Sequence, residues 1–333
     1  MHFVAALDKY PEMRSVLCLF EGGATGAADG YYRMLNKPAS TLLHLGPGLA
    51  NGLANLHNAK KANSGVINVV GEHALEHIKL NAPLTSDIEG IASPVSHWVK
   101  TCKSSLHVGK HAAEAIKESL NPPGKISTLI LPGDTAWNEG KTVKPLENYE
   151  MEKIDQEKIK TTAEELKNAK NPMILVGGKA LEENNLNLAS KIASKFNCVI
   201  MTDFFNAKLE RGAGRVKPIR IPYNVDRAVN LLKDFDKIIL IGAREPVAFF
   251  AYPNKPGVLT SKSTKFVNFV KIGENITEAL EDLCEYINAK NIIANNISKS
   301  SFPTLQKGEL NPSSIGSVLG NLIPENAIIV DES

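Results

Sequence analysis

The chain has 333 residues, of which 43% are hydrophobic and 22% are charged. This composition is typical of a folded globular protein, and the length allows two ordinary domains. The 38 basic and 36 acidic residues leave a formal net charge of only +2, and the basic residues are scattered over both halves. A nucleic-acid partner is therefore not expected.

Membrane and secreted proteins are disfavoured as well. No apolar run approaches the roughly 20 residues that a membrane helix needs, and the first ten residues lack the basic region of a signal peptide. The four cysteines, which are Cys18, Cys102, Cys198 and Cys284, form neither a C-x-x-C pair nor a compact disulfide framework. We expect a cytoplasmic protein without a membrane partner.

In the first part of the chain, short apolar runs alternate with longer helical patterns. A helix is expected over residues 2–13, and strands are expected over 15–20, 40–45, 65–70 and 127–132. These runs are continuously hydrophobic, which indicates strands buried on both faces of a parallel sheet. Helices between them supply the crossovers.

The alternation of apolar runs and helical patterns stops near residue 139 and resumes after residue 156. Residues 139–156 are charged and have no apolar period, which favours a linker. Four further strands are expected at 173–178, 197–202, 237–242 and 265–270. The expected domains are 1–138 and 157–295, followed by 296–333, which holds a helix starting near Asn311 and a strand over 327–330. The predicted fold is α/β, with two doubly wound parallel-sheet three-layer domains plus the start of a third.

Glu21 is the first candidate for a functional residue. It follows an expected strand, and ligands of open parallel sheets bind at the carboxyl ends of strands. A carboxylate at a helix start also gains from the helix dipole, so a purely structural role stays open. Gly22, Gly23 and Gly26 each cost the helix about 1 kcal/mol relative to alanine. We expect something to approach that backbone closely.

Two other motifs suggest different chemistry. Gly46, Gly48 and Gly52 form G-x-G-x-x-x-G, one residue longer than the dinucleotide fingerprint, which would make the protein a nucleotide-binding oxidoreductase with Glu72 as its ribose-binding acid. His73, Glu76 and His77 spell H-x-x-E-H, a zinc hydrolase arrangement, although no third ligand follows. Gly177 and Gly178 indicate either a tight turn or room for an ADP group.

A wider combination of motifs carries a resemblance. Glu21 is followed by A-D-G-Y at residues 28–31, the G-P-G at 46–48 is followed by Asn51, and an expected strand closes on Gly71. Together these residues resemble the pyrimidine-binding domain of the thiamine diphosphate-dependent 2-oxo acid enzymes, the acetolactate synthase and benzoylformate decarboxylase group. Residues 157–290 resemble that family's middle domain, and 324–333 resemble the first strand of its diphosphate-binding domain.

The resemblance assigns roles to residues. The acid matching Glu21 would hydrogen-bond N1′ of the cofactor's aminopyrimidine and favour the tautomer that activates the thiazolium ring, and His44 would transfer protons to and from the substrate. The expected catalytic residues are therefore Glu21 and His44. The expected cofactor-binding residues are Gly22, Gly46, Pro47, Gly48, Asn51, Gly71 and Glu72.

The resemblance also implies a reaction and an assembly. It implies thiamine diphosphate- and Mg-dependent decarboxylation or carboligation of a 2-oxo acid in the manner of acetolactate synthase, within a homodimer or homotetramer. A benzoylformate decarboxylase-like reaction and a non-catalytic degenerate domain remain alternatives. FAD is not expected. The Mg ligands are expected beyond Ser333, so the 333 residues are expected to be an inactive fragment of a longer enzyme.

Overall fold

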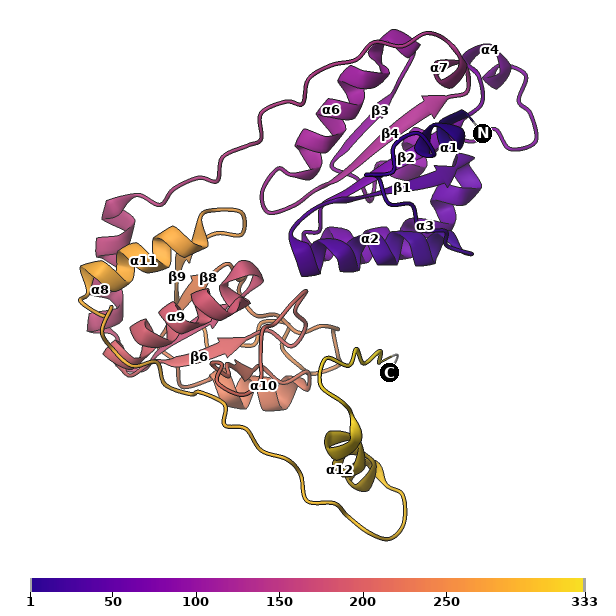
Figure 1. Ribbon diagram of the computed structural model, residues 1–333. Helices are drawn as coiled ribbons and strands as arrows, with labels where there is room; N and C mark the ends of the chain where they lie inside the picture. The colour runs from indigo at the N-terminus through magenta and orange to yellow at the C-terminus, as the bar shows by residue number, and fades with distance from the viewer. Residues whose placement is uncertain (1, 332–333) are drawn as a thin grey trace.

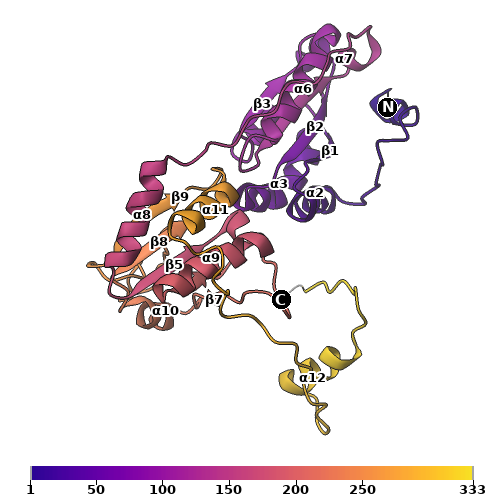
Figure 2. The same ribbon diagram turned by 60° about the vertical axis from the view of Figure 1, so that its left-hand side comes forward.

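The structure is a computed structural model that describes residues 2–331, and it contains two parallel sheets (Figures 1 and 2). The first sheet has the order β1-β2-β4-β3, formed by β1 (Ala39–His44), β2 (Val66–Glu72), β3 (Trp98–Thr101) and β4 (Ile126–Pro132). All its pairs are parallel, and His44 of β1 lies opposite Gly71 of β2. The predicted α/β class with two doubly wound parallel sheets is confirmed.

Helices cover both faces of the first sheet. On one face, α2 (Glu21–Leu35), α3 (Leu45–Ala62) and α5 (Ile88–Ala92) pack on β1, β2 and β4 through one apolar cluster. On the other face, α6 (Val108–Ser119) packs on β4 through Ala115 and Leu129. The short elements of this part are α1 (His2–Leu7), α4 (Leu75–Ile78), η1 (Ser105–His107) and α7 (Asp134–Trp137).

The second sheet has the order β7-β6-β5-β8-β9. Its strands are β5 (Pro172–Val176), β6 (Val199–Thr202), β7 (Ile219–Arg220), β8 (Lys237–Ile241) and β9 (Lys265–Val270). Every residue of β5 and β8 is buried, as their continuous hydrophobicity predicts.

One face of the second sheet carries α8 (Gln156–Asn168), α9 (Glu183–Phe196) and α11 (Ile276–Tyr286), and the other carries α10 (Val225–Leu232). A short helix, η2 (Gly178–Leu181), follows β5. Residues 139–155, between the two sheets, contain no helix or strand. No described helix is long and apolar enough to cross a membrane.

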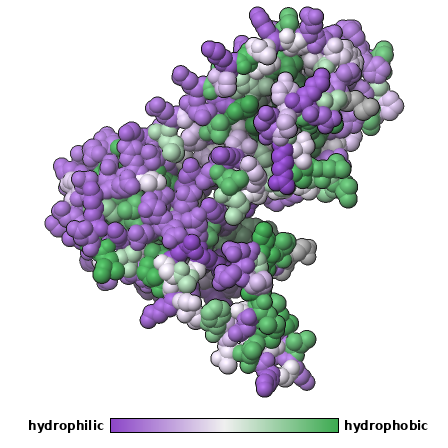
Figure 3. All heavy atoms as spheres, viewed as in Figure 1, coloured by the Kyte–Doolittle hydropathy of each residue, from purple (hydrophilic) through white to green (hydrophobic). Residues whose placement is uncertain are grey.

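Two expected strands are wrong. Residues 15–20 are irregular and, except for the half-buried Cys18, exposed, with Leu19 fully exposed. Residues 327–330 are likewise irregular, with Ile328 exposed to 92%. Neither segment pairs with a neighbouring strand, so apolar composition alone does not make them strands. The helix expected near Asn311 is present as α12 (Pro312–Leu322), and the Asn311 side chain caps it. Hydrophobic residues gather on the surface around α12 (Figure 3).

Candidate active site

Glu21 is the first residue of α2, and its carboxylate lies beside α3. Asn51 Nδ2 donates a hydrogen bond to Glu21 Oε2 at 3.2 Å. A Cβ atom on Gly48 would stand 3.6 Å from Glu21 Oε1, so glycine keeps the space beside this oxygen open. The side chain is half-buried. Glu21, Gly48 and Asn51, which are far apart in two sequence motifs, therefore form one polar site between two helices.

His44 lies at the same edge, at the end of β1. A Cβ atom on Gly71 would be 3.9 Å from His44 Nδ1, and one on Gly48 would be 3.7 Å from His44 Cβ. Gly48 therefore separates His44 from Glu21. Since His44 is exposed, its imidazole is accessible from solvent.

The other predicted site residues lie differently. The Cβ position of Gly22 is directed at the Phe20 ring, and that of Gly46 is directed at Ser86. Glu72 Oε1 accepts a hydrogen bond from His73 N at 2.6 Å, so this carboxylate turns to its own chain. Pro47 is exposed. The geometry therefore groups Glu21, His44, Gly48, Asn51 and Gly71 more closely than the remaining four.

The G-P-G segment is the first turn of α3 and not a loop. Leu45 adopts the left-handed region at φ 59°, a conformation that costs a non-glycine residue about 1–2 kcal/mol, and α3 begins at this residue. Proline is well tolerated in the first turn of a helix, because the N–H it lacks has no partner there. This tight turn sets Gly48 and Asn51 directly beside the end of β1.

The two rival motifs lose support in the structure. Gly46, Gly48 and Gly52 lie within α3, and Thr25 of α2 fills the space at Gly52, so they form no phosphate-binding loop. Glu76 pairs with Lys79 at 2.8 Å. Across residues 2–331, no group of three or more His, Cys, Asp or Glu side chains is arranged to hold a metal ion. The His73 and His77 rings lie 5.3 Å apart, and among these residues no third ligand joins them.

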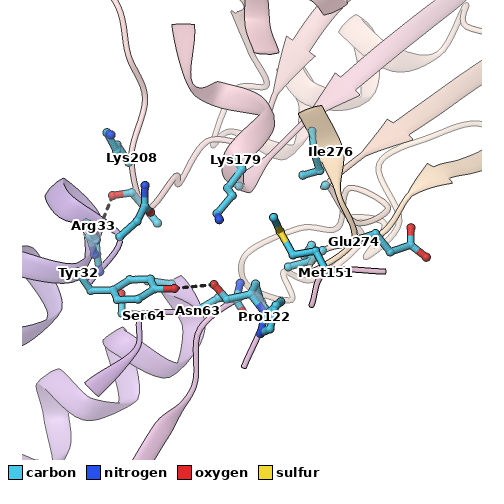
Figure 4. Close-up of a pocket in the computed structure, with 18 of the residues that line it drawn as sticks. Tyr32, Arg33, Asn63, Ser64, Pro122, Met151, Lys179, Lys208, Glu274 and Ile276 are labelled. Atoms are coloured by element: carbon cyan, nitrogen blue, oxygen red, sulfur yellow. Dashed lines mark hydrogen bonds between the residues drawn. The ribbon is translucent and has the colours of Figure 1, made fainter. Parts of the chain in front are cut away.

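A cavity of about 270 Å³ lies beside Gly178, where the sequence indicated a tight turn or room for an ADP group, but its other walls were not predicted (Figure 4). It lies between the C-terminal end of α2, residues 148–151 and the carboxyl ends of β5, β8 and β9. Lys179 points into it, and Tyr32 on the opposite wall donates a hydrogen bond to Pro123 O at 2.8 Å. Burial raises the pKa of Tyr32. Gly178 and Gly242 line the cavity, and a Cβ atom on Gly177 would lie 2.7 Å from Gly242 O, so these three glycines are the sequence feature that could have indicated it. The cavity adjoins the opposite end of α2 from Glu21, so it is separate from the candidate active site.

Comparison with known proteins identifies the first domain. Residues 1–92 match the family described as "Thiamine pyrophosphate enzyme, N-terminal TPP binding domain". A Mycobacterium tuberculosis protein named "Putative acetolactate synthase large subunit IlvX" is 40% identical over 333 residues, which are 100% of this chain and 64% of that protein. Benzoylformate decarboxylase of Pseudomonas aeruginosa is 24% identical and matches 98% of this chain and 65% of its own length.

The fold is shared with solved structures. The thiamine diphosphate-dependent 4-hydroxybenzoylformate decarboxylase of Rhodococcus jostii superposes with a TM-score of 0.71 at 18% identity, over 94% of this chain and 63% of that one. The chain thus spans about 64% of the length of these two relatives. Residues 1–92 thus match the N-terminal domain of the thiamine pyrophosphate enzymes, and the whole chain is similar in sequence to a protein named as an acetolactate synthase subunit and in fold to thiamine diphosphate-dependent enzymes.

Proposed function

We propose that the chain supplies the pyrimidine-binding side of an enzyme that decarboxylates or ligates 2-oxo acids with thiamine diphosphate. The observation that carries the proposal is the half-buried Glu21 carboxylate, bonded to Asn51 and left open on the side of Gly48. Acetolactate synthases and a benzoylformate decarboxylase are among the relatives, which supports a 2-oxo acid as the substrate.

The residues present fit an aminopyrimidine ring. A Cβ atom on Gly48 would enter the space beside Glu21 Oε1, which the glycine leaves open. Such a space admits a flat ring, while a carboxyl group at its edge can accept or donate a hydrogen bond to a ring nitrogen. When bound, thiamine diphosphate would supply the electron sink for the decarboxylation.

The chain's own residues would then bind, orient and exchange protons. Glu21 would share a proton with the ring nitrogen through a hydrogen bond. Asn51 fixes the carboxylate through its side-chain amide. His44, across Gly48 from Glu21, would exchange a proton with the substrate at the carboxyl end of β1. Within residues 2–331, no group of three or more His, Cys, Asp or Glu side chains is arranged to hold a metal ion, and we assign no magnesium or diphosphate ligand. A homodimer or homotetramer is part of the proposal.

Replacing the acid without changing its shape tests this function. In the full-length natural protein, we expect Glu21→Gln to reduce kcat on a 2-oxo acid by at least about 100-fold, the range typical of a lost acid–base group. Circular dichroism and thermal unfolding should be unchanged. The matched control is Glu76→Gln, an exposed acid of the H-x-x-E-H motif, which should keep full activity. Equal activity of Glu21→Gln and the natural protein would reject the assignment.

A benzoylformate decarboxylase-like reaction is a second candidate, favoured by the position of His44 against Gly71. Product analysis separates the two reactions. Benzoylformate converted to the free aldehyde, with loss of this activity in His44→Ala, would favour the decarboxylase. Pyruvate converted to an acyloin product would favour the synthase-like carboligation.

A further inference from the structure

The contact between α2 and α3 is built from small residues on both helices. The helices lie side by side in both views (Figures 1 and 2). Gly22 and Gly26 are one turn apart on α2, and Gly48 and Gly52 are one turn apart on α3. A Cβ atom on Gly52 would lie 2.8 Å from Thr25 Cγ2, closer than real contacts allow. The two backbones therefore approach more closely than alanine at this position would permit.

Two polar side chains bridge this contact. Asn55 Nδ2 donates a hydrogen bond to Gly22 O at 2.7 Å. The hydroxyl of the fully buried Thr25 lies 3.1 Å from Gly52 O and 3.0 Å from Glu21 O. The Asn55 amide occupies space that Gly26 leaves open, since a Cβ atom there would stand 3.1 Å from Asn55 Nδ2.

The first turn of α2 needs such an anchor. A helix usually fixes its first turn with a Ser, Thr, Asp or Asn cap, and first turns without one fray. The N-cap of α2 is Phe20, which makes no side-chain capping bond. Asn55 does not replace this cap, because it donates to a carbonyl, but it ties the first turn to α3 through Gly22 O, the carbonyl of the residue that follows Glu21. It lies one helical turn from Asn51 on α3.

We propose that Asn55 is a positioning residue for Glu21. By tying the first turn of α2 to α3, Asn55 sets the Glu21 carboxylate at the distance from Asn51 at which their hydrogen bond forms. The hydrogen bond of Asn55 goes to the Gly22 carbonyl and not to the Glu21 carboxylate, so Asn55 acts through the backbone. Its consequence for the cofactor rests on the proposed function, whereas its effect on the Glu21–Asn51 bond does not.

The first test observes that bond directly, without a cofactor. In protein labelled with ¹⁵N-asparagine, Glu21→Ala identifies the side-chain amide signal of Asn51 as it appears when the bond to Glu21 is absent. We expect Asn55→Ala to move this signal most of the way to that position. Asn58→Ala, an exposed asparagine of the same helix, is the matched control and should not move it. An Asn51 signal unchanged in Asn55→Ala would overturn the proposal.

The second test separates positioning from mere stabilisation. By calorimetry on the folded full-length protein, we expect Asn55→Ala to weaken thiamine diphosphate binding about tenfold, and to cause no further loss when combined with Glu21→Gln. An equal loss in both backgrounds would show that Asn55 only stabilises the fold. If Asn55→Ala does not fold, Asn55→Ser retains a donor and should show the same change at smaller size. If the natural protein binds no thiamine diphosphate, the proposed function fails, while the Asn51 signal still decides the role of Asn55.

Discussion

Two glycines on one face of α3 are expected to respond in opposite ways to an added methyl group. At Gly48 the nearest atom is Glu21 Oε1 at 3.6 Å, an ordinary contact, whereas at Gly52 it is Thr25 Cγ2 at 2.8 Å. Gly48→Ala should retain or gain stability, up to about 1 kcal/mol from helix propensity. Gly52→Ala should lose about 1–3 kcal/mol through overpacking.

Urea unfolding of both variants measures this difference. Cofactor binding should show the reverse order, because the methyl group of Gly48→Ala fills space beside the proposed pyrimidine-binding carboxylate while that of Gly52→Ala does not enter the site. Equal losses of stability in the two variants would contradict the close α2–α3 packing.

At the scale of single residues, the sequence indicates the Glu21 carboxylate but not the side chain of Asn55 that anchors its helix. Glu21 was identified as the residue after an expected strand that the structure does not form, and Asn51 through the family resemblance, yet the structure joins the two by a hydrogen bond. The glycine at 26 is expected to admit a ligand, yet the atom that approaches it belongs to Asn55. The packing of α2 on α3 decides which faces of the two helices meet. The local sequence of either helix therefore does not predict that Asn55 lies against Gly26.

Among the elements, strands with two covered faces are predictable and isolated segments are not. The continuously apolar runs that became β2, β4, β5 and β8 have neighbours on both sides in their sheets. Residues 15–20 have equal apolar character, yet they lie unpaired while β1 remains an edge strand with Leu42 exposed to 44%. The short β3 and β7 were missed because they are edge strands whose residues are half-buried or exposed, so they lack the apolar run that identified the equally short β6.

His97 is expected to make the stability of the first domain depend on pH. Its backbone N donates to Ile126 O at 2.8 Å, and its Nδ1 accepts from Ile126 N at 3.0 Å, so a neutral ring secures the start of β4. Burial lowers the pKa of His97, and the charges of Lys60 and Lys125 lower it further. The unfolded chain, in which a histidine has a pKa of about 6.5, therefore binds this proton more readily.

The contribution of His97 is therefore fully present above about pH 6.5 and is lost as the pH falls toward the lower pKa of the folded state. We expect His97→Asn, which keeps an acceptor that does not titrate, to flatten the decline in unfolding free energy between pH 7 and pH 5 (about the range in which histidine titrates). Urea unfolding at several pH values measures it. An unchanged pH dependence would show that the acid sensitivity resides elsewhere.

At the scale of the whole molecule, a few polar contacts join the two sheets' domains. Arg33 Nη1 donates to Ala207 O at 3.3 Å, and Asn36 Nδ2 donates to Glu182 Oε1 at 3.4 Å. The charged composition of 139–156 indicates a connecting segment, but it does not indicate these contacts or the cavity between them. Interfaces of this polar kind permit relative movement of domains. The contact is therefore expected to respond to a single added methyl group.

Gly273 is the position to test. It has φ +98°, and a Cβ atom there would lie 3.2 Å from Pro123 Cδ, across the contact between the domains. Gly308 has φ +113° with nothing within 4 Å of its Cβ position, so Gly308→Ala carries similar backbone strain, about 1–3 kcal/mol, without the contact. We expect only Gly273→Ala to speed tryptic cleavage within residues 139–155 several-fold and to increase the radius of gyration in solution scattering. If both variants behaved alike, strain in the chain, and not contact between the domains, would be the cause.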